Sequence, residues 1–338
     1  MTDPDRDYLW DPSVPGDPQI QALERVLRPH SARARGLLNR PPAIAPVRPR
    51  RGRWLRIPAA LAATVAALLL MAHNYRLSWP EGAPWEAAIS QQGRAAQRLD
   101  LQPGETLTTS HGQTARLEVA RIGEVALASA SSVRLLRTGN GQHRIAMEAG
   151  RLHARIWAPP GHFGIVSGDA LFIDMGCEFE LNVDPSGAGT LAVLSGWVAY
   201  EHDAREVLVP AGHRLVFDRA GSGTPVSDQA GLQVRDAIRA LDAALRAGDE
   251  PLIERLAEMV AVNASDSDYH SLLSLLTRHP QLATTALYPR LARVLGRSSD
   301  EPLHRAQWAR GDHVATDLWW ERVPAQPKQR LVNWRDAF

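Results

Sequence analysis

The sequence of 338 residues contains one cysteine, Cys177, and has a formal net charge of only +1. A single cysteine excludes an intrachain disulfide framework and any multi-cysteine zinc or iron–sulfur site. The chain also lacks the HExxH, P-loop, GxSxG and GxGxxG motifs of hydrolases and nucleotide-binding proteins. We therefore expect no cofactor, no metal and no enzymatic activity.

Three further features could suggest a functional site, but the sequence argues against each of them. His153 and His162 do not form the HxH pair of a cupin. The run Ser265–Asp268 has no glycine or terminal glutamate of an EF-hand calcium loop. Cys177 shares strand parity with Phe179, which predicts a buried, unreactive thiol.

Positive charge is concentrated near the N-terminus and is followed by a long apolar run. Residues 1–56 contain eleven Arg against six Asp or Glu, and the nineteen residues from Ile57 to Tyr75 carry no formal charge. Nineteen helical residues span roughly 28 Å, close to the thickness of a bilayer core. The sequence predicts a transmembrane helix over 54–76, although a buried core helix and a cleaved signal peptide are alternatives.

Residues suited to the membrane interface flank this run. They are Trp54, Arg56, Tyr75 and Trp79. The arginines before the run outnumber those after it, so the positive-inside rule places residues 1–53 in the cytoplasm and the rest outside it. The expected location is the bacterial inner membrane, with a single pass, contact with membrane lipid and a periplasmic C-terminal bulk.

The inner arm, residues 1–53, contains one candidate amphipathic helix. Asp17-Pro18 is a helix start and Pro29 ends the run. This segment is either a docking site for a partner or a frayed helix in a disordered tail. Its candidate partner contacts are Trp10, Ile20, Leu23 and Leu27. The basic residues near the membrane are explained by topology and anionic lipid, so we expect no direct nucleic-acid binding.

Beyond a juxtamembrane connector at 77–99, apolar and polar residues alternate with a period of two over about 100–222. In one run Ala115, Leu117 and Val119 alternate with charged residues, and turn signals such as Asn140-Gly141 separate successive runs. This pattern predicts an all-β domain, a sandwich or a solenoid-like stack. Trp157 has the parity of an exposed contact residue.

Residues 228–338 are predicted to be helical. Apolar residues recur at helical spacing in several segments, separated by glycine and proline. The fold class is therefore a single transmembrane helix, an all-β domain and an all-α, repeat-like C-terminal domain. Trp319 and Trp320 are candidate partner contacts, with core packing as the alternative.

The segments GRLHARIWAPPGHFGIVSGDALFIDMGCEFELNV, LSGWVAYE and VPAGHRL resemble the FecR family of membrane-anchored regulators. The resemblance covers about residues 100–220, and its motifs are structural. It implies a periplasmic β-domain that relays a signal to an extracytoplasmic-function (ECF) sigma factor, in the manner of an anti-sigma factor. The chain departs from the family in its short arm before the span and in its helical tail.

The expected function is thus a non-enzymatic single-pass regulator or sensor of FecR type. Its partners would be an ECF sigma factor, bound through residues 1–40, and an unknown periplasmic protein or glycan. The alternative is an envelope scaffold or binding protein anchored in the inner membrane, without a sigma-factor partner.

Overall fold

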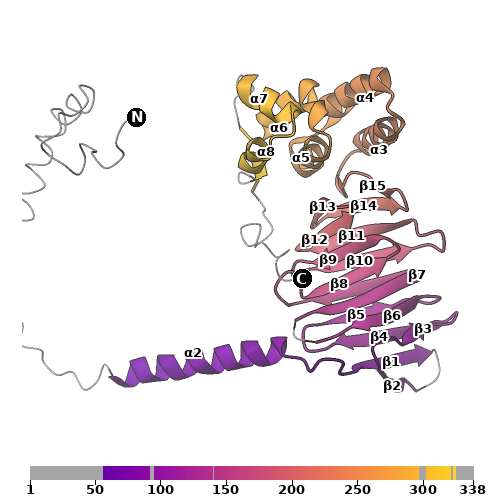
Figure 1. Ribbon diagram of the computed structural model, residues 1–338, viewed down its shortest axis with the longest axis vertical. Coiled ribbons are helices and arrows are strands. Elements are labelled where there is room, and N and C mark those ends of the chain that lie inside the picture. Colours follow the sequence, from indigo (N-terminus) through magenta and orange to yellow (C-terminus); the bar gives the residue numbers. More distant parts are fainter. Residues whose placement is uncertain (1–55, 92–94, 140, 297–301, 321–322, 325–338) are drawn as a thin grey trace, which may run out of the picture. The chain divides into compact units, whose positions relative to one another are not determined.

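The computed structural model describes residues 56–338, except 92–94, 140, 297–301, 321–322 and 325–338 (Figure 1). The chain divides into two compact units, Met1–Ala67 and Leu68–Phe338. The predicted inner-arm helix and its contacts Trp10, Ile20, Leu23 and Leu27 lie outside the described residues.

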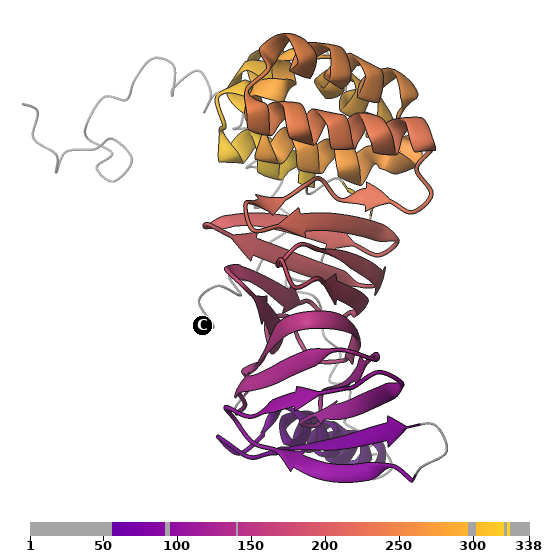
Figure 2. The ribbon, with the colours of Figure 1, turned by 90° about the vertical axis from the view of Figure 1, so that its right-hand side faces the viewer.

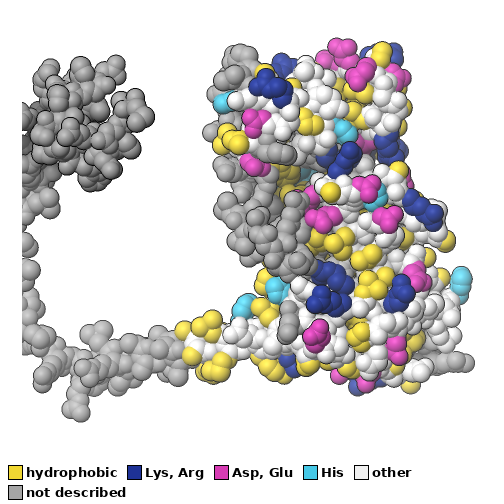
Figure 3. Space-filling model, viewed as in Figure 1, with side chains coloured by type: hydrophobic (Ala, Val, Ile, Leu, Met, Phe, Trp, Pro, Cys, Tyr) yellow, Lys and Arg dark blue, Asp and Glu magenta, His cyan; other side chains and the backbone are white. Residues whose placement is uncertain are grey.

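Helix α2 (Arg56–Leu77) occupies the apolar run. Its side chains are described from Val65 onward, and a series of them is exposed and hydrophobic, including Leu68, Leu69, Leu70 and Met71 (Figure 3). Within the part of the chain that the structure describes, no helix is both long and apolar enough to cross a membrane. The membrane-spanning role of 54–76 therefore stays a prediction.

A large β-domain follows, as the alternating pattern predicts. Its strands are β1 (Trp85–Gln91), β2 (Gln97–Leu101), β3 (Thr106–Thr108), β4 (Gln113–Val119), β5 (Gly123–Leu127), β6 (Ser132–Arg137), β7 (His143–Ile156), β8 (Phe163–Ser167), β9 (Ala170–Asp174), β10 (Glu178–Val183), β11 (Gly189–Ser195), β12 (Trp197–His202), β13 (Arg205–Pro210), β14 (His213–Asp218), β15 (Gly221–Ser222) and β16 (Val226–Ser227). The segment 77–99, taken above as a connector, contains β1 and the start of β2.

The strands stack above one another and enclose one apolar core (Figure 2). One sheet contains β2, β1, β4, β5, β7, β10, β11 and β14, with β15 and β16 paired to β14. The other contains β3, β6, β7, β8, β9, β12 and β13. Alternate side chains face inward, as in β4, where Ala115, Leu117 and Val119 are buried.

Strand β7 belongs to both sheets. Its first half pairs with β6 and β8, and its second half pairs with β5 and β10. Between the halves lies Gly150, whose φ of 107° favours glycine. A Cβ at this position would also lie 2.4 Å from the Cα of Ser131. The glycine therefore lets one strand change sheets within a tightly packed core.

The C-terminal region is helical, as predicted. It consists of α3 (Leu232–Ala247), α4 (Glu250–Asn263), α5 (Tyr269–Arg278), α6 (Leu287–Val294), α7 (Pro302–Ala309) and α8 (His313–Trp320), with short 3-10 helices η1 (Asp266–Asp268) and η2 (Pro280–Thr284). Gly248 ends α3 in the left-handed conformation, and the side chain of Asp249 accepts a hydrogen bond from Leu252 N at the start of α4.

The helices share an apolar core with the end of the β-domain. Ile173, Trp197 and Ala199 of the strands, and Met175 just after β9, belong to the same buried cluster as the inner faces of the helices. The described parts of the β-domain and helical region are therefore packed on one another and are not joined only by a linker.

A buried polar network also links the helical region to the β-domain. The carboxylate of Asp242 on α3 accepts hydrogen bonds from Thr224 N (2.7 Å) and Thr224 Oγ1 (2.8 Å). Arg278 on α5 lies 3.8 Å from Asp242 Oδ1 and donates to Ser222 O at 2.7 Å. The network joins two helices to the end of β15 and to the loop between β15 and β16.

Candidate functional site

The end of α2 is attached to the β-domain by one arginine. Arg121, in the turn between β4 and β5, donates through Nη1 to Tyr75 O (3.1 Å) and Ser78 O (2.9 Å). These carbonyls lie at the C-terminal end of the helix, where backbone acceptors lack intrahelical partners and a positive charge is favourable. Arg121 thus supplies both the missing donors and the charge.

The same guanidinium also stacks on aromatic rings. Its central carbon lies 3.8 Å from the centroid of the Tyr75 ring and 5.2 Å from that of Trp79. Cation–π contacts of this kind add to the attachment, most strongly where the groups are partly removed from water. We call Arg121, Tyr75, Ser78 and Trp79 the arginine clamp.

The segment after the clamp is held in place as well. Leu77 and Trp79 pack against the β-domain core, and Gly82 N donates to Thr138 O at 3.0 Å. Trp85, at the start of β1, is fully buried and donates through Nε1 to Thr138 Oγ1 at 2.8 Å. The short link from α2 to β1 is therefore fastened at several points.

The polar partner of Trp85 is itself part of a buried pair. Thr138 Oγ1 lies 2.9 Å from His143 Nδ1. Burial, with contributions from His162 and Arg144, lowers the pKa of His143 to about 4. His143 is therefore neutral near pH 7, and this anchor carries no buried charge.

The structure brings together two of the residues predicted to flank a membrane, Tyr75 and Trp79, and adds Arg121, which the sequence analysis did not single out. Trp54 lies outside the described residues, and the side chain of Arg56 is not described. Trp157 is 49% exposed, as its parity predicts, and its backbone N–H donates to Ile122 O at 2.9 Å, beside the clamp.

Trp319 and Trp320 are buried and do not form an exposed contact surface. They are 2% and 5% exposed within the helical core. The ring of Trp319 lies 5.0 Å from that of Tyr288 and 5.2 Å from that of Trp308, between centroids. Aromatic rings at helical spacing fill a core as readily as they form a binding surface, so sequence alone left both alternatives open.

The cysteine is buried, as its parity predicts. Cys177 is 2% exposed, and its Sγ and N lie 2.5 and 2.9 Å from Asp174 Oδ1. Burial, reinforced by the neighbouring carboxylate, raises the pKa of the thiol well above its ordinary value. Burial also raises the pKa of Asp174 to about 7. The described residues include no group of three or more His, Cys, Asp or Glu side chains that could hold a metal.

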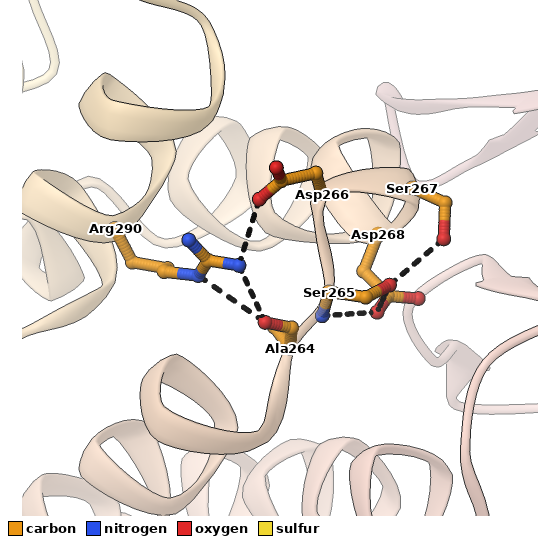
Figure 4. Close-up of polar contacts among 6 residues, drawn as sticks. All are labelled: Ala264, Ser265, Asp266, Ser267, Asp268 and Arg290. Atoms are coloured by element: carbon orange, nitrogen blue, oxygen red, sulfur yellow. Dashed lines mark hydrogen bonds and ion pairs between the residues drawn. The ribbon is translucent and has the colours of Figure 1, made fainter.

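The Ser265–Asp268 run comprises the short 3-10 helix η1 and its N-cap residue, Ser265 (Figure 4). Asp268 Oδ2 accepts from Ser265 N (2.7 Å) and Ser265 Oγ (2.6 Å), as in a capping box. Arg290 donates to Ala264 O at 2.7 Å and to Asp266 Oδ1 at 3.0 Å. These acidic side chains hold the turn between α4 and α5 in place.

The chain has little similarity to known proteins. No family model matches the sequence, and no curated protein matches it. Two crystal structures of a candidate anti-sigma factor from Parabacteroides distasonis ATCC 8503, at 1.65 and 2.50 Å resolution, are similar to part of the chain at a TM-score of 0.33 and 12% identity. The similarity covers 40% of this chain and 65% or 64% of that one, less than two thirds of its length. A likeness of this extent assigns neither a family nor a function.

Proposed function

We propose that this protein is a non-enzymatic, single-pass regulator of FecR type. Its outer body, the β-domain and helical region, would sense a periplasmic state, and residues 1–40 would relay that state to a cytoplasmic partner, an ECF sigma factor. The FecR resemblance of residues 100–220 supports this assignment.

The arginine clamp is the observation that carries the proposal. A passive anchor needs only a flexible tether, whereas a relay needs the outer body to be coupled mechanically to the helix. Two hydrogen bonds, two cation–π contacts and the packing of Leu77 and Trp79 provide such coupling. A change in the β-domain would therefore move the end of α2.

The exposed apolar side chains of α2 support the membrane assignment. Leu68, Leu69, Leu70 and Met71 are consecutive and each is more than 60% exposed. Four consecutive helical residues point to all sides, so the apolar surface surrounds the helix at this level. Such a surface is favourable in a lipid environment and unfavourable in water.

The decisive experiment replaces the clamp arginine in the full chain. Arg121→Ala should uncouple the outer body from the helix, so a transcription reporter for the partner sigma factor should lose most of its response to the signal. The matched control is Arg239→Ala, which removes a 77% exposed arginine that pairs with Asp236 on the surface of α3. A wild-type response from Arg121→Ala would contradict the relay.

An envelope scaffold is the second candidate function. An open trough of about 350 Å³ on the outer surface of the first sheet favours it, with Arg116, Arg151, His153 and Glu180 in its lining. Such a surface could hold another envelope component. Deleting residues 1–40 separates the two functions, because a scaffold would keep its phenotype and a regulator would lose it.

A further inference from the structure

The loop that follows β7 exposes an aromatic side chain. Residues 157–160 of this loop have the sequence WAPP, and we call them the tryptophan loop. Trp157 is 49% exposed. The indoles of Trp79, Trp85 and Trp308 each donate a hydrogen bond within the chain, whereas among the described residues the indole of Trp157 has no such partner. The fold therefore uses neither the full ring surface nor the N–H of this side chain.

The pairing of β5 with β7 places the tryptophan loop beside the arginine clamp. Gly123, the first residue of β5, pairs with Ile156, the last residue of β7. The backbone N–H of Trp157 then donates to Ile122 O at 2.9 Å. Ile122 directly follows Arg121, the residue that binds the end of α2. The exposed indole is thus attached, through its backbone, to the turn that carries the clamp arginine.

The clamp lies where the apolar surface of α2 ends. Met71 and Tyr75 are each 62% exposed, and the next residue, Arg76, is the first charge after the uncharged run. The four residues from Met71 to Tyr75 rise about 6 Å along the helix. The headgroup region on each side of a bilayer core is roughly 5–7 Å thick. With lipid around α2 at Leu68–Met71, as proposed above, Tyr75 and the clamp lie at the depth of the lipid headgroups.

The chemistry of the tryptophan loop suits this depth. Tryptophan is favoured at membrane interfaces, because its ring is apolar and its N–H can donate to water or to a lipid oxygen. The loop contains no charged side chain, so its contact with lipid removes no charge from water. Arg76 and Arg121 place positive charge at the same end of the domain, which is favourable beside anionic lipid. A bilayer therefore fits this surface better than a protein partner does.

We propose that the tryptophan loop is a second membrane contact of the outer body, in which the indole of Trp157 enters the headgroup region of the bilayer. The inference rests on the proposed function for the membrane position of α2. The β-domain would then meet the membrane at two points, the clamp and the loop. Two points of contact restrict how the domain can tilt and rotate about the end of the helix, which one attachment does not.

Fluorescence quenching in the full chain tests the contact. Trp157→Cys, Leu70→Cys and Ser110→Cys would each be labelled with the fluorophore NBD, in nanodiscs of phosphatidylcholine and phosphatidylglycerol. Cys177 is 2% exposed and should not take the label in the native chain. Position 110 is the control for the far end of the domain, because it precedes β4 and Arg121 follows it, and the seven residues of β4 span roughly 20 Å.

Lipids with a nitroxide on the headgroup or on the acyl chain report the depth of each label. The headgroup nitroxide should quench the label at position 157 at least about threefold more than the label at position 110. The acyl-chain nitroxide should quench the label at position 70. Quenching at 70 with equal, weak quenching at 157 and 110 would overturn the loop contact and keep the membrane position of α2. No quenching at 70 would reject the membrane assignment, and the loop contact with it.

A second set of variants tests the indole itself. The label is moved to Pro160→Cys, and residue 157 is left as Trp or changed to Phe or Asp. Trp157→Phe keeps an aromatic ring and should retain most of the quenching, whereas Trp157→Asp should reduce it at least about twofold, because a carboxylate is unfavourable at this depth beside anionic lipid. Failure of the label to reach Cys177 would show that each variant is folded. Equal quenching with Trp, Phe and Asp at residue 157 would overturn the proposal.

Discussion

At the scale of single residues, burial decides the chemistry of the cysteine and histidines in this protein. Removal from water penalises a charged side chain, so acids hold their protons more strongly and bases hold them less strongly. Cys177 is held as a neutral thiol, and His143 and His270 are held as neutral imidazoles.

Cys177 should therefore be unreactive in the folded protein. Iodoacetamide at pH 8 should label it only when denaturant is present, because the thiolate is the reactive form and the side chain is 2% exposed. Ser110→Cys, which adds a thiol at an exposed turn, is the control and should be labelled at once in the native state. Equal labelling of both positions would show that Cys177 is accessible.

His270 should make the folded state less stable in acid. The pKa of its ring is about 3 in the folded chain against 6.5 in the unfolded chain. Below pH 6.5 the unfolded chain binds a proton that the folded chain does not, so stability falls as pH falls towards 3. At pH 5 this loss is about 2 kcal/mol, since each pH unit corresponds to about 1.4 kcal/mol.

The measurement compares wild type with His270→Phe by urea unfolding at pH 7.5 and pH 5. The variant lacks the titrating ring, so its stability relative to wild type should be higher at pH 5 than at pH 7.5. The comparison isolates one group, because Asp174, whose pKa is raised to about 7, contributes with the opposite sign in both proteins. A constant difference between the two proteins would contradict the assignment.

At the scale of elements, Asp242 holds the helical region on the β-domain. Asp242→Ala would leave Thr224 without its acceptor and would remove the carboxylate that lies 3.8 Å from the guanidinium of Arg278, which is only 19% exposed. Breaking a buried pair typically costs about 3 kcal/mol or more. Chemical denaturation should show that loss. Asp236→Ala on the same helix removes a 72% exposed partner of Arg239 and should change stability by no more than about 0.5 kcal/mol.

The elements themselves follow well from local sequence. Alternation correctly gave the inward face of β4, and glycine separates helical segments of the C-terminal region as expected, since Gly248 lies between α3 and α4. The exchange of β7 between sheets could not be predicted, because it depends on which strands pair over long range. Arg121 was missed for a similar reason, since only folding brings it to Tyr75, 46 positions away in the sequence.

At the scale of the whole molecule, the proposed topology places the N-terminus and the bulk on opposite sides of the inner membrane. Alkaline phosphatase fused after residue 230 should be active in cells, because that enzyme matures only in the periplasm, and a fluorescent protein fused at the N-terminus should be bright. The reverse pattern, or a mature chain that starts after residue 76, would rule out the anchored arrangement.

The double membership of β7 has a consequence for how related chains can vary. Adding or removing a hairpin at an end of the stack changes the number of strands, and the remaining strands stay paired with one another. A deletion within β7 would instead take the central strand from both sheets at once. Length differences among homologues should therefore gather at hairpin turns and leave the fourteen positions of β7 intact.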